Sequence, residues 1–166
     1  MMPSQLRVII GVVVSVGIVL IIGLWLFPDK PPIPGPIKAK LTSTLLVPRG
    51  GDYQVNRESA KYDPALKVLA YNIAIKGVGS AVVSEQPTPD QFNDIPGYYD
   101  QVISQFHEYT HFDSVVGTVH LVHPDTNSDH QTAVINSAGT LIFVKPSQNL
   151  SDDQWRQFFR SFVVIR

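Results

Sequence analysis

The stretch LKVLAYNIAIKGVGSAVVSEQ, residues 66–86, decides the fold that we expect. Its first part, residues 66–75, is dominated by β-branched and aromatic residues, which favours a strand, and residues 80–86 return with a similar pattern. The Gly-rich segment between them is typical of a hairpin connection, so the two strands should be antiparallel. We therefore predict an antiparallel sheet that extends outward from this hairpin.

Further short strands are expected on both sides of this hairpin, because similar apolar runs alternate with turn signals. The cluster PRGGD at residues 48–52 and the segment NSAG at residues 136–139 are two such signals. The additional predicted strands are residues 41–47, 53–59, 115–123, 131–135 and 140–145.

Two helices are predicted among these strands. The middle helix covers residues 98–108, whose apolar side chains fall along one face. The second begins at Ser151, which forms the capping-box pattern Ser-x-x-Gln with Gln154. Its apolar stripe consists of Trp155, Phe158, Phe159, Phe162 and Val163. The order of elements predicts an α+β fold: an antiparallel sheet with a middle helix and a C-terminal amphipathic helix packed on one face.

The N-terminal run VIIGVVVSVGIVLIIGLWLF, from Val8 to Phe27, predicts a membrane helix. Fifteen of its twenty residues are Val, Ile, Leu or Phe, none is charged, and a helix of this length spans about 30 Å. No small-x-small cleavage site follows, so we interpret the run as an uncleaved signal anchor in the lipid bilayer. The pair Gly11 and Ser15 leaves open whether two anchors pack together, and the oligomeric state is not predicted.

The charges beside this helix favour a cytoplasmic N-terminus, although they do not all agree. Arg7 and the amino terminus favour that orientation, whereas the lysines at positions 30, 38 and 40 oppose it. Long domains translocate largely regardless of such charges. We therefore predict a short cytoplasmic tail at residues 1–7, a transmembrane helix at 8–27, a Pro-rich linker at 28–40 and a soluble α+β domain at 41–166. The prolines of residues 28–36 predict an extended, semi-rigid spacer.

The composition excludes several classes of function. The chain contains no cysteine, which excludes disulfides, thiolate zinc sites and thiol catalysis. From residue 41 onward nine Lys and Arg residues stand against thirteen Asp and Glu, so the domain carries a net charge near −4. A mildly acidic domain without a basic cluster is a poor nucleic-acid binder, and we predict no nucleic-acid partner.

One string has the pattern of a catalytic site. Residues 107–111 read HEYTH and match H-E-x-x-H, in which two histidines on one helix face bind zinc and the glutamate acts as general base. The extended form H-E-x-x-H-x-x-G-x-x-H is not matched, because residues 114 and 117 are Ser and Gly. A glutamate further along the chain cannot be the third ligand either, because no Glu follows Glu108. We predict no catalytic residue, cofactor or metal, and keep His107, Glu108 and His111 as candidates for the alternative hypothesis of a zinc site.

Other polar residues give weaker signals. The side chains of His120, Asp125 and His130 could each supply a third zinc ligand in principle. His120 and His123 are three apart on a predicted strand and should face opposite sides, which disfavours a joint site. Residues 125–129 open like a calcium loop, but His130 stands where that loop needs Gly. We interpret this segment as a solvated hairpin loop.

The order of anchor, Pro-rich stalk and short α+β domain resembles small uncharacterised bacterial single-pass membrane proteins. The short segments that carry the resemblance are SEQP at 84–87, GTV at 117–119, GTL at 139–141 and SDDQW at 151–155. The resemblance implies an extracytoplasmic location and supplies neither an activity nor functional residues.

These observations predict a membrane-anchored, extracytoplasmic and non-enzymatic binding or scaffolding domain at the bacterial cell envelope, and they do not identify its ligand or protein partner. Two alternatives remain open. One is a small zinc-dependent hydrolase that uses His107, Glu108 and His111. The other is an accessory subunit of a membrane complex, with the anchor itself as its binding surface.

Overall fold

The computed structural model describes residues 31–123 and 130–165 of the chain. The chain divides into two compact units, Met1–Pro31 and Pro32–Arg166, and the fold reported below is that of the second. Within the described residues, no helix is both long and apolar enough to cross a membrane. The predicted membrane helix at residues 8–27 and the calcium-like loop at residues 125–129 lie outside the described residues.

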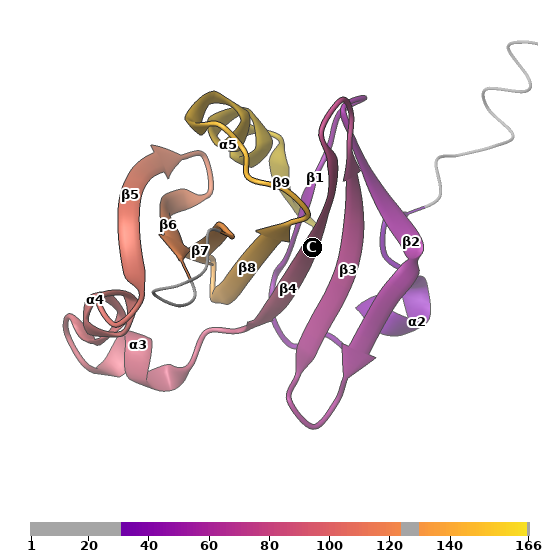
Figure 1. The fold of residues 1–166 in the computed structure, drawn as a ribbon. Helices are drawn as coiled ribbons and strands as arrows, with labels where there is room; N and C mark the ends of the chain where they lie inside the picture. Colours follow the sequence, from indigo (N-terminus) through magenta and orange to yellow (C-terminus); the bar gives the residue numbers. More distant parts are fainter. Residues whose placement is uncertain (1–30, 124–129, 166) are drawn as a thin grey trace, which may run out of the picture. The chain divides into compact units, whose positions relative to one another are not determined.

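The second unit is built on a seven-stranded sheet in the order β2-β3-β4-β8-β7-β6-β5, in which every neighbouring pair is antiparallel (Figure 1). The strands are β2 (Tyr53–Asp63), β3 (Val68–Ile75), β4 (Gly79–Pro87), β5 (His107–Ser114), β6 (Gly117–His123), β7 (Thr132–Ser137) and β8 (Thr140–Pro146). The predicted hairpin at residues 66–86 is confirmed as β3 and β4, and Ile75 pairs with Gly79 beside the turn. The antiparallel sheet predicted from the sequence is therefore present.

A pair of short helices carries the chain from one half of the sheet to its far edge. They are α3 (Asp90–Asp94) and α4 (Tyr98–Ile103), which follow β4 and precede β5. From β5 the chain then returns strand by strand until β8 pairs with β4. The sheet thus consists of two meanders that meet at its centre.

The sheet buries side chains on both faces, because alternate residues of each strand point to opposite sides. The larger core contains the buried residues Ile135 and Ile142 and the aromatic side chains of α5 (Asp152–Arg160). The smaller core contains Val134 and Leu141, which are the adjacent residues on the same strands, together with Ile103 of α4. The helices therefore cover opposite faces, and the prediction that both pack on one face was wrong.

A separate two-stranded ribbon consists of β1 (Leu45–Pro48) and β9 (Phe162–Ile165). The predicted C-terminal helix is present with its capping box, but it ends at Arg160. Phe162 and Val163 lie on β9 and not on the predicted helical stripe. Their spacing fits a helix, but the pairing of Val163 with Val47 across the ribbon prevails over the local pattern.

The middle helix is shorter than the prediction of residues 98–108. It ends at Ile103, and residues 107–114 form edge strand β5. Only Phe112 is buried on this strand, so its sequence carries little of the alternation that marks a strand.

The last part of the predicted linker is folded onto the domain. Residues Gly35–Lys38 form the short helix α2, and Ile33 is only 1% exposed and belongs to the larger core. The compact unit begins at Pro32, so the extended spacer predicted through residue 36 does not continue over these residues.

Candidate functional site

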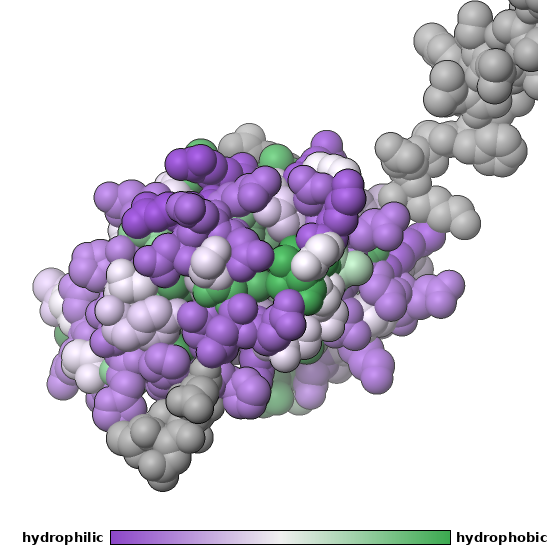
Figure 2. Space-filling view, turned by 45° about the horizontal axis from the view of Figure 1, so that its top comes forward, coloured by the Kyte–Doolittle hydropathy of each residue, from purple (hydrophilic) through white to green (hydrophobic). Residues whose placement is uncertain are grey.

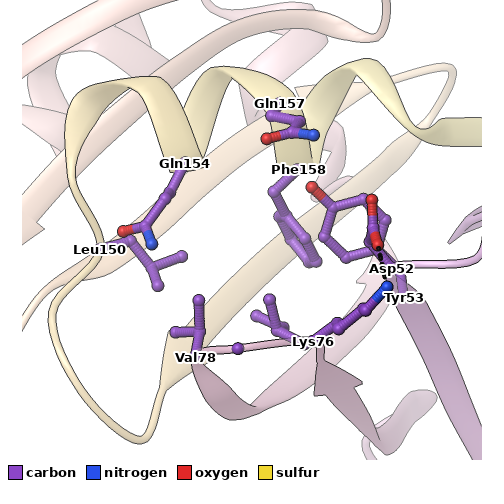
Figure 3. A pocket seen from close by; sticks show the side chains of 10 residues that line it. Asp52, Tyr53, Lys76, Val78, Leu150, Gln154, Gln157 and Phe158 are labelled. Atoms are coloured by element: carbon purple, nitrogen blue, oxygen red, sulfur yellow. Dashed lines mark ion pairs between the residues drawn. The ribbon is translucent and has the colours of Figure 1, made fainter.

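A cleft of about 360 Å³ lies between α5, the turn of the β3–β4 hairpin and the start of β2 (Figure 3). Ligand pockets in proteins commonly begin near this size. The residues that line the cleft are Asp52, Tyr53, Ile75, Lys76, Gly77, Val78, Leu150, Gln154, Gln157 and Phe158.

The floor of the cleft is apolar because it is the margin of the larger core. Phe158 is fully buried, and its ring makes an edge contact with Tyr53 at a centroid distance of 5.3 Å. Val78 and Leu150 complete this floor beneath the helix (Figure 3). An apolar floor favours a ligand that presents an apolar group.

The rim of the cleft is polar. The Nζ atom of Lys76 lies 3.7 Å from Oδ1 of Asp52, and both side chains are mostly exposed. Gln157 is exposed on α5. Gln154 already uses its Oε1 atom to accept a hydrogen bond from the backbone N–H of Ser151. The face of the molecule seen in Figure 2 accordingly shows apolar surface ringed by hydrophilic residues.

The Tyr53 hydroxyl stays protonated near neutral pH. Burial raises the pKa of Tyr53 above its ordinary value of 10.0, and the nearby carboxylate of Asp52 raises it further. The hydroxyl is therefore able both to donate and to accept a hydrogen bond at the edge of the cleft. With the amides of the rim, it gives the cleft the groups that recognise a peptide or another neutral polar group.

The string at residues 107–111 lies on β5 and not on a helix, so its residues are not arranged with helical spacing. His107 pairs with His123 across the β5–β6 hairpin, and His111 pairs with His120. A register shift between Glu108 and Thr110 interrupts the regular alternation of side chains between the two faces of the sheet. The geometry that makes H-E-x-x-H a zinc motif on a helix is absent.

The fold nevertheless brings two of the three candidates together with a histidine from β6. Oε1 of Glu108 lies 2.8 Å from Nδ1 of His120 and 3.2 Å from Nδ1 of His111. The His120 side chain is 13% exposed and its ring contacts Tyr99, whereas His111 is 66% exposed. Within residues 31–123 and 130–165, no group of three or more His, Cys, Asp or Glu side chains is arranged to hold a metal ion. The arrangement is a carboxylate at a sheet edge that is hydrogen-bonded to His120 and lies within ion-pair distance of His111.

The cleft could not be found from the sequence, because its lining comes from three separate segments. Only the aromatic stripe of the C-terminal helix pointed toward it, and that stripe predicts a core in most proteins. The polar members of the rim, such as Gln157 and Lys76, carry no local motif.

Comparison with known proteins gives no match: no family model, curated protein or solved structure is significantly similar to this chain.

Proposed function

We propose that the chain is a non-enzymatic binding or scaffolding module that residues 8–27 anchor in a membrane. Its extracytoplasmic domain receives a protein partner in the cleft between α5 and the β3–β4 hairpin. The observation that carries this proposal is the cleft itself, with its apolar floor and its polar rim. The charged members of the lining, Asp52 and Lys76, form an ion pair with each other at the rim, which supports a binding role for the cleft.

A protein partner suits the cleft because the floor accommodates an apolar side chain while the rim meets a backbone. The half-buried side chains of Val78 and Tyr53 offer the apolar contact, and the Gln157 amide has both a donor and an acceptor. The paired charges of Asp52 and Lys76 leave the rim close to neutral, which disfavours a strongly charged ligand.

The proposed location is supported by the sequence of residues 8–27. It is also supported by the resemblance to anchored bacterial domains.

Site-specific photo-crosslinking in intact membranes tests the binding proposal. p-Benzoylphenylalanine at Gln157 should give one discrete adduct, since this residue lies on the rim of the cleft. The matched control is the same probe at Leu66, which is 69% exposed on the loop between β2 and β3. Val78→Asp in the Gln157 probe chain should remove the adduct, because it places a charge on the apolar floor.

Three results would contradict the proposal. The first is the absence of an adduct at Gln157 when the chain is folded and present in the membrane. The second is the same adduct from Leu66, and the third is an adduct at Gln157 that persists with Val78→Asp. A small-molecule ligand would instead give no protein adduct and a change in the circular dichroism of Tyr53 and Phe158.

The zinc hydrolase alternative has one favourable observation, the contact of Glu108 with His111 and His120. It predicts one zinc per chain and its loss in His111→Ala. The binding module predicts no stoichiometric zinc in either protein, as measured by elemental analysis of the full chain.

The accessory-subunit alternative places the binding surface on the anchor. It predicts that replacing residues 8–27 with an unrelated apolar helix abolishes the adduct at Gln157. The cleft proposal predicts that the adduct survives this replacement.

A further inference from the structure

Strand β1 is held to the seven-stranded sheet by side chains and not by a backbone ladder. Its own ladder partner is β9, and the pair forms a separate ribbon. Its residues 45–48 are nevertheless all buried. Because buried backbone groups need partners, the polar atoms of β1 that do not face β9 must be satisfied from the main sheet.

Three side chains of the main sheet supply partners for β1 and for Thr44, the residue before it. Thr140, which is fully buried on β8, donates from Oγ1 to the carbonyl of Thr44 at 2.6 Å. Glu85, on β4 and only 3% exposed, accepts a hydrogen bond from the backbone N–H of Leu46 at 3.1 Å. Tyr71, on β3, places its hydroxyl 2.9 Å from the Leu46 carbonyl and 2.7 Å from Oε1 of Glu85. We call Glu85, Tyr71 and the backbone of Leu46 the β1 clasp.

The number of protons in the β1 clasp decides how many of its contacts are hydrogen bonds. The Tyr71 hydroxyl has one proton, yet it lies within bonding distance of two acceptors. If Glu85 is protonated, it donates to the Tyr71 oxygen and Tyr71 donates to the Leu46 carbonyl, so every contact is satisfied. If Glu85 is ionised, Tyr71 must choose between the carboxylate and the Leu46 carbonyl. The neutral carboxyl is therefore the form that fits the complete clasp.

The surroundings of Glu85 favour the same form. Burial raises the pKa of Glu85 from its ordinary value of 4.5 to about 7, and the bonds from Tyr71 and Leu46 only partly oppose this effect. The pKa of Tyr71 is raised well above 10.0, so its hydroxyl remains a donor. The residues opposite Glu85 in the register are Leu69 on β3 and Ile142 on β8, both apolar. Tyr71 is the one titratable group that contacts it among the described residues.

We infer that the β1 clasp depends on a proton. With Glu85 neutral, Tyr71 donates to the Leu46 carbonyl and fixes the β1–β9 ribbon to the sheet; with Glu85 ionised, the carboxylate competes for the Tyr71 proton and the Leu46 carbonyl is released. Ionisation leaves either the carboxylate or the Leu46 carbonyl without the Tyr71 proton inside the core. The contact from Thr140 to Thr44 is independent of pH and continues to hold the start of β1. The loosening is therefore local to Leu46 and does not unfold the ribbon.

Nuclear magnetic resonance of the full chain in detergent micelles tests this inference, since the chain contains only three glutamates, at positions 58, 85 and 108. In a glutamate-labelled sample, the carboxyl signal missing from Glu85→Gln belongs to Glu85. We expect this signal to titrate near neutral pH. Over the same range, the carbonyl carbon signal of Leu46 should move upfield with the same midpoint, because this carbonyl loses the hydrogen bond from Tyr71. The Leu46 N–H keeps its bond to the carboxylate and should stay protected from exchange. Glu85→Gln, which keeps the shape and offers an uncharged donor, should hold the carbonyl signal constant.

Tyr71→Phe provides a second variant that does not depend on the folding of Glu85→Gln. It removes the donor that favours the ionised form, so the midpoint for Glu85 should move to higher pH. Glu58→Gln, at an exposed position on β2, is the control and should change neither the midpoint nor the Leu46 carbonyl signal. The inference is overturned if the Leu46 carbonyl signal is constant while Glu85 titrates, if it moves equally in Glu85→Gln, or if the midpoint is unmoved in Tyr71→Phe.

Discussion

At the scale of single residues, Glu85 is a charge-capable group inside a core that offers it one hydroxyl and one backbone N–H. An ionised carboxylate is costly to bury, so the folded state binds its proton more tightly than the unfolded chain. At the other contact, Thr140 donates a hydrogen bond to the Thr44 carbonyl, and neither group titrates. One end of β1 is thus sensitive to pH and the other is not.

The raised pKa of Glu85 predicts the pH dependence of stability. Its stabilising contribution is complete below pH 4.5 and is lost as pH rises through the folded-state value of about 7. At about 1.4 kcal/mol per pKa unit, the whole change is on the order of 3 kcal/mol. Urea denaturation at about pH 5 and pH 8 should show a larger fall in unfolding free energy for the native chain than for Glu85→Gln. Parallel falls in the two proteins would show that other groups are responsible.

Ala138 adopts a backbone conformation that suits glycine or asparagine. In the two-residue turn between β7 and β8, φ is 49° at Ala138 and 78° at Gly139, as a type I′ hairpin requires. A left-handed conformation costs an ordinary L-residue about 1–2 kcal/mol. Ala138→Asn should therefore raise the unfolding free energy by about 0.5–1 kcal/mol, measured by urea denaturation. Gly139→Ala, at the neighbouring left-handed position, should lower it, and stabilisation by both changes would contradict this explanation.

At the scale of elements, sequence reasoning succeeded where one local signal decided the structure. The hairpin of β3 and β4 has strand-forming residues on both sides of a Gly-rich turn, and the start of α5 has a complete capping box. Sequence reasoning failed where pairing between distant segments determined the structure. The polar strand β5 is ordered by its pairing with β6, and β9 by its pairing with β1. The cleft combines segments that no local pattern connects.

The capping box should contribute measurably to the stability of α5. Oγ of Ser151 accepts a hydrogen bond from the Gln154 backbone N–H, and Oε1 of Gln154 accepts one from the Ser151 backbone N–H. Ser151→Ala should lower the unfolding free energy by about 1 kcal/mol. Gln157→Ala, exposed on the same helix and outside the cap, should leave it almost unchanged. Equal effects of the two substitutions in thermal or urea unfolding would argue against a role for the cap.

At the scale of the whole molecule, the chain consists of a proposed membrane anchor and, later in the sequence, a folded domain that carries a cleft. The folded unit, Pro32–Arg166, is mostly antiparallel sheet with a few short helices. The apolar run at residues 8–27 is the basis for the proposed anchor, and the cleft beside α5 is the basis for the proposed binding. Both proposals depend on the domain being outside the cytoplasm, where an envelope partner is accessible.

Labelling of single cysteines in intact bacterial cells tests this arrangement most directly, because the chain has no cysteine of its own. One variant is Leu66→Cys, at a residue of the domain that is 69% exposed, and the other is Ser4→Cys in the N-terminal tail. We expect a membrane-impermeant maleimide to label Leu66→Cys in intact cells, and to label Ser4→Cys only after the cells are permeabilised. The opposite pattern, or labelling of both variants only after permeabilisation, would contradict an anchored extracytoplasmic domain.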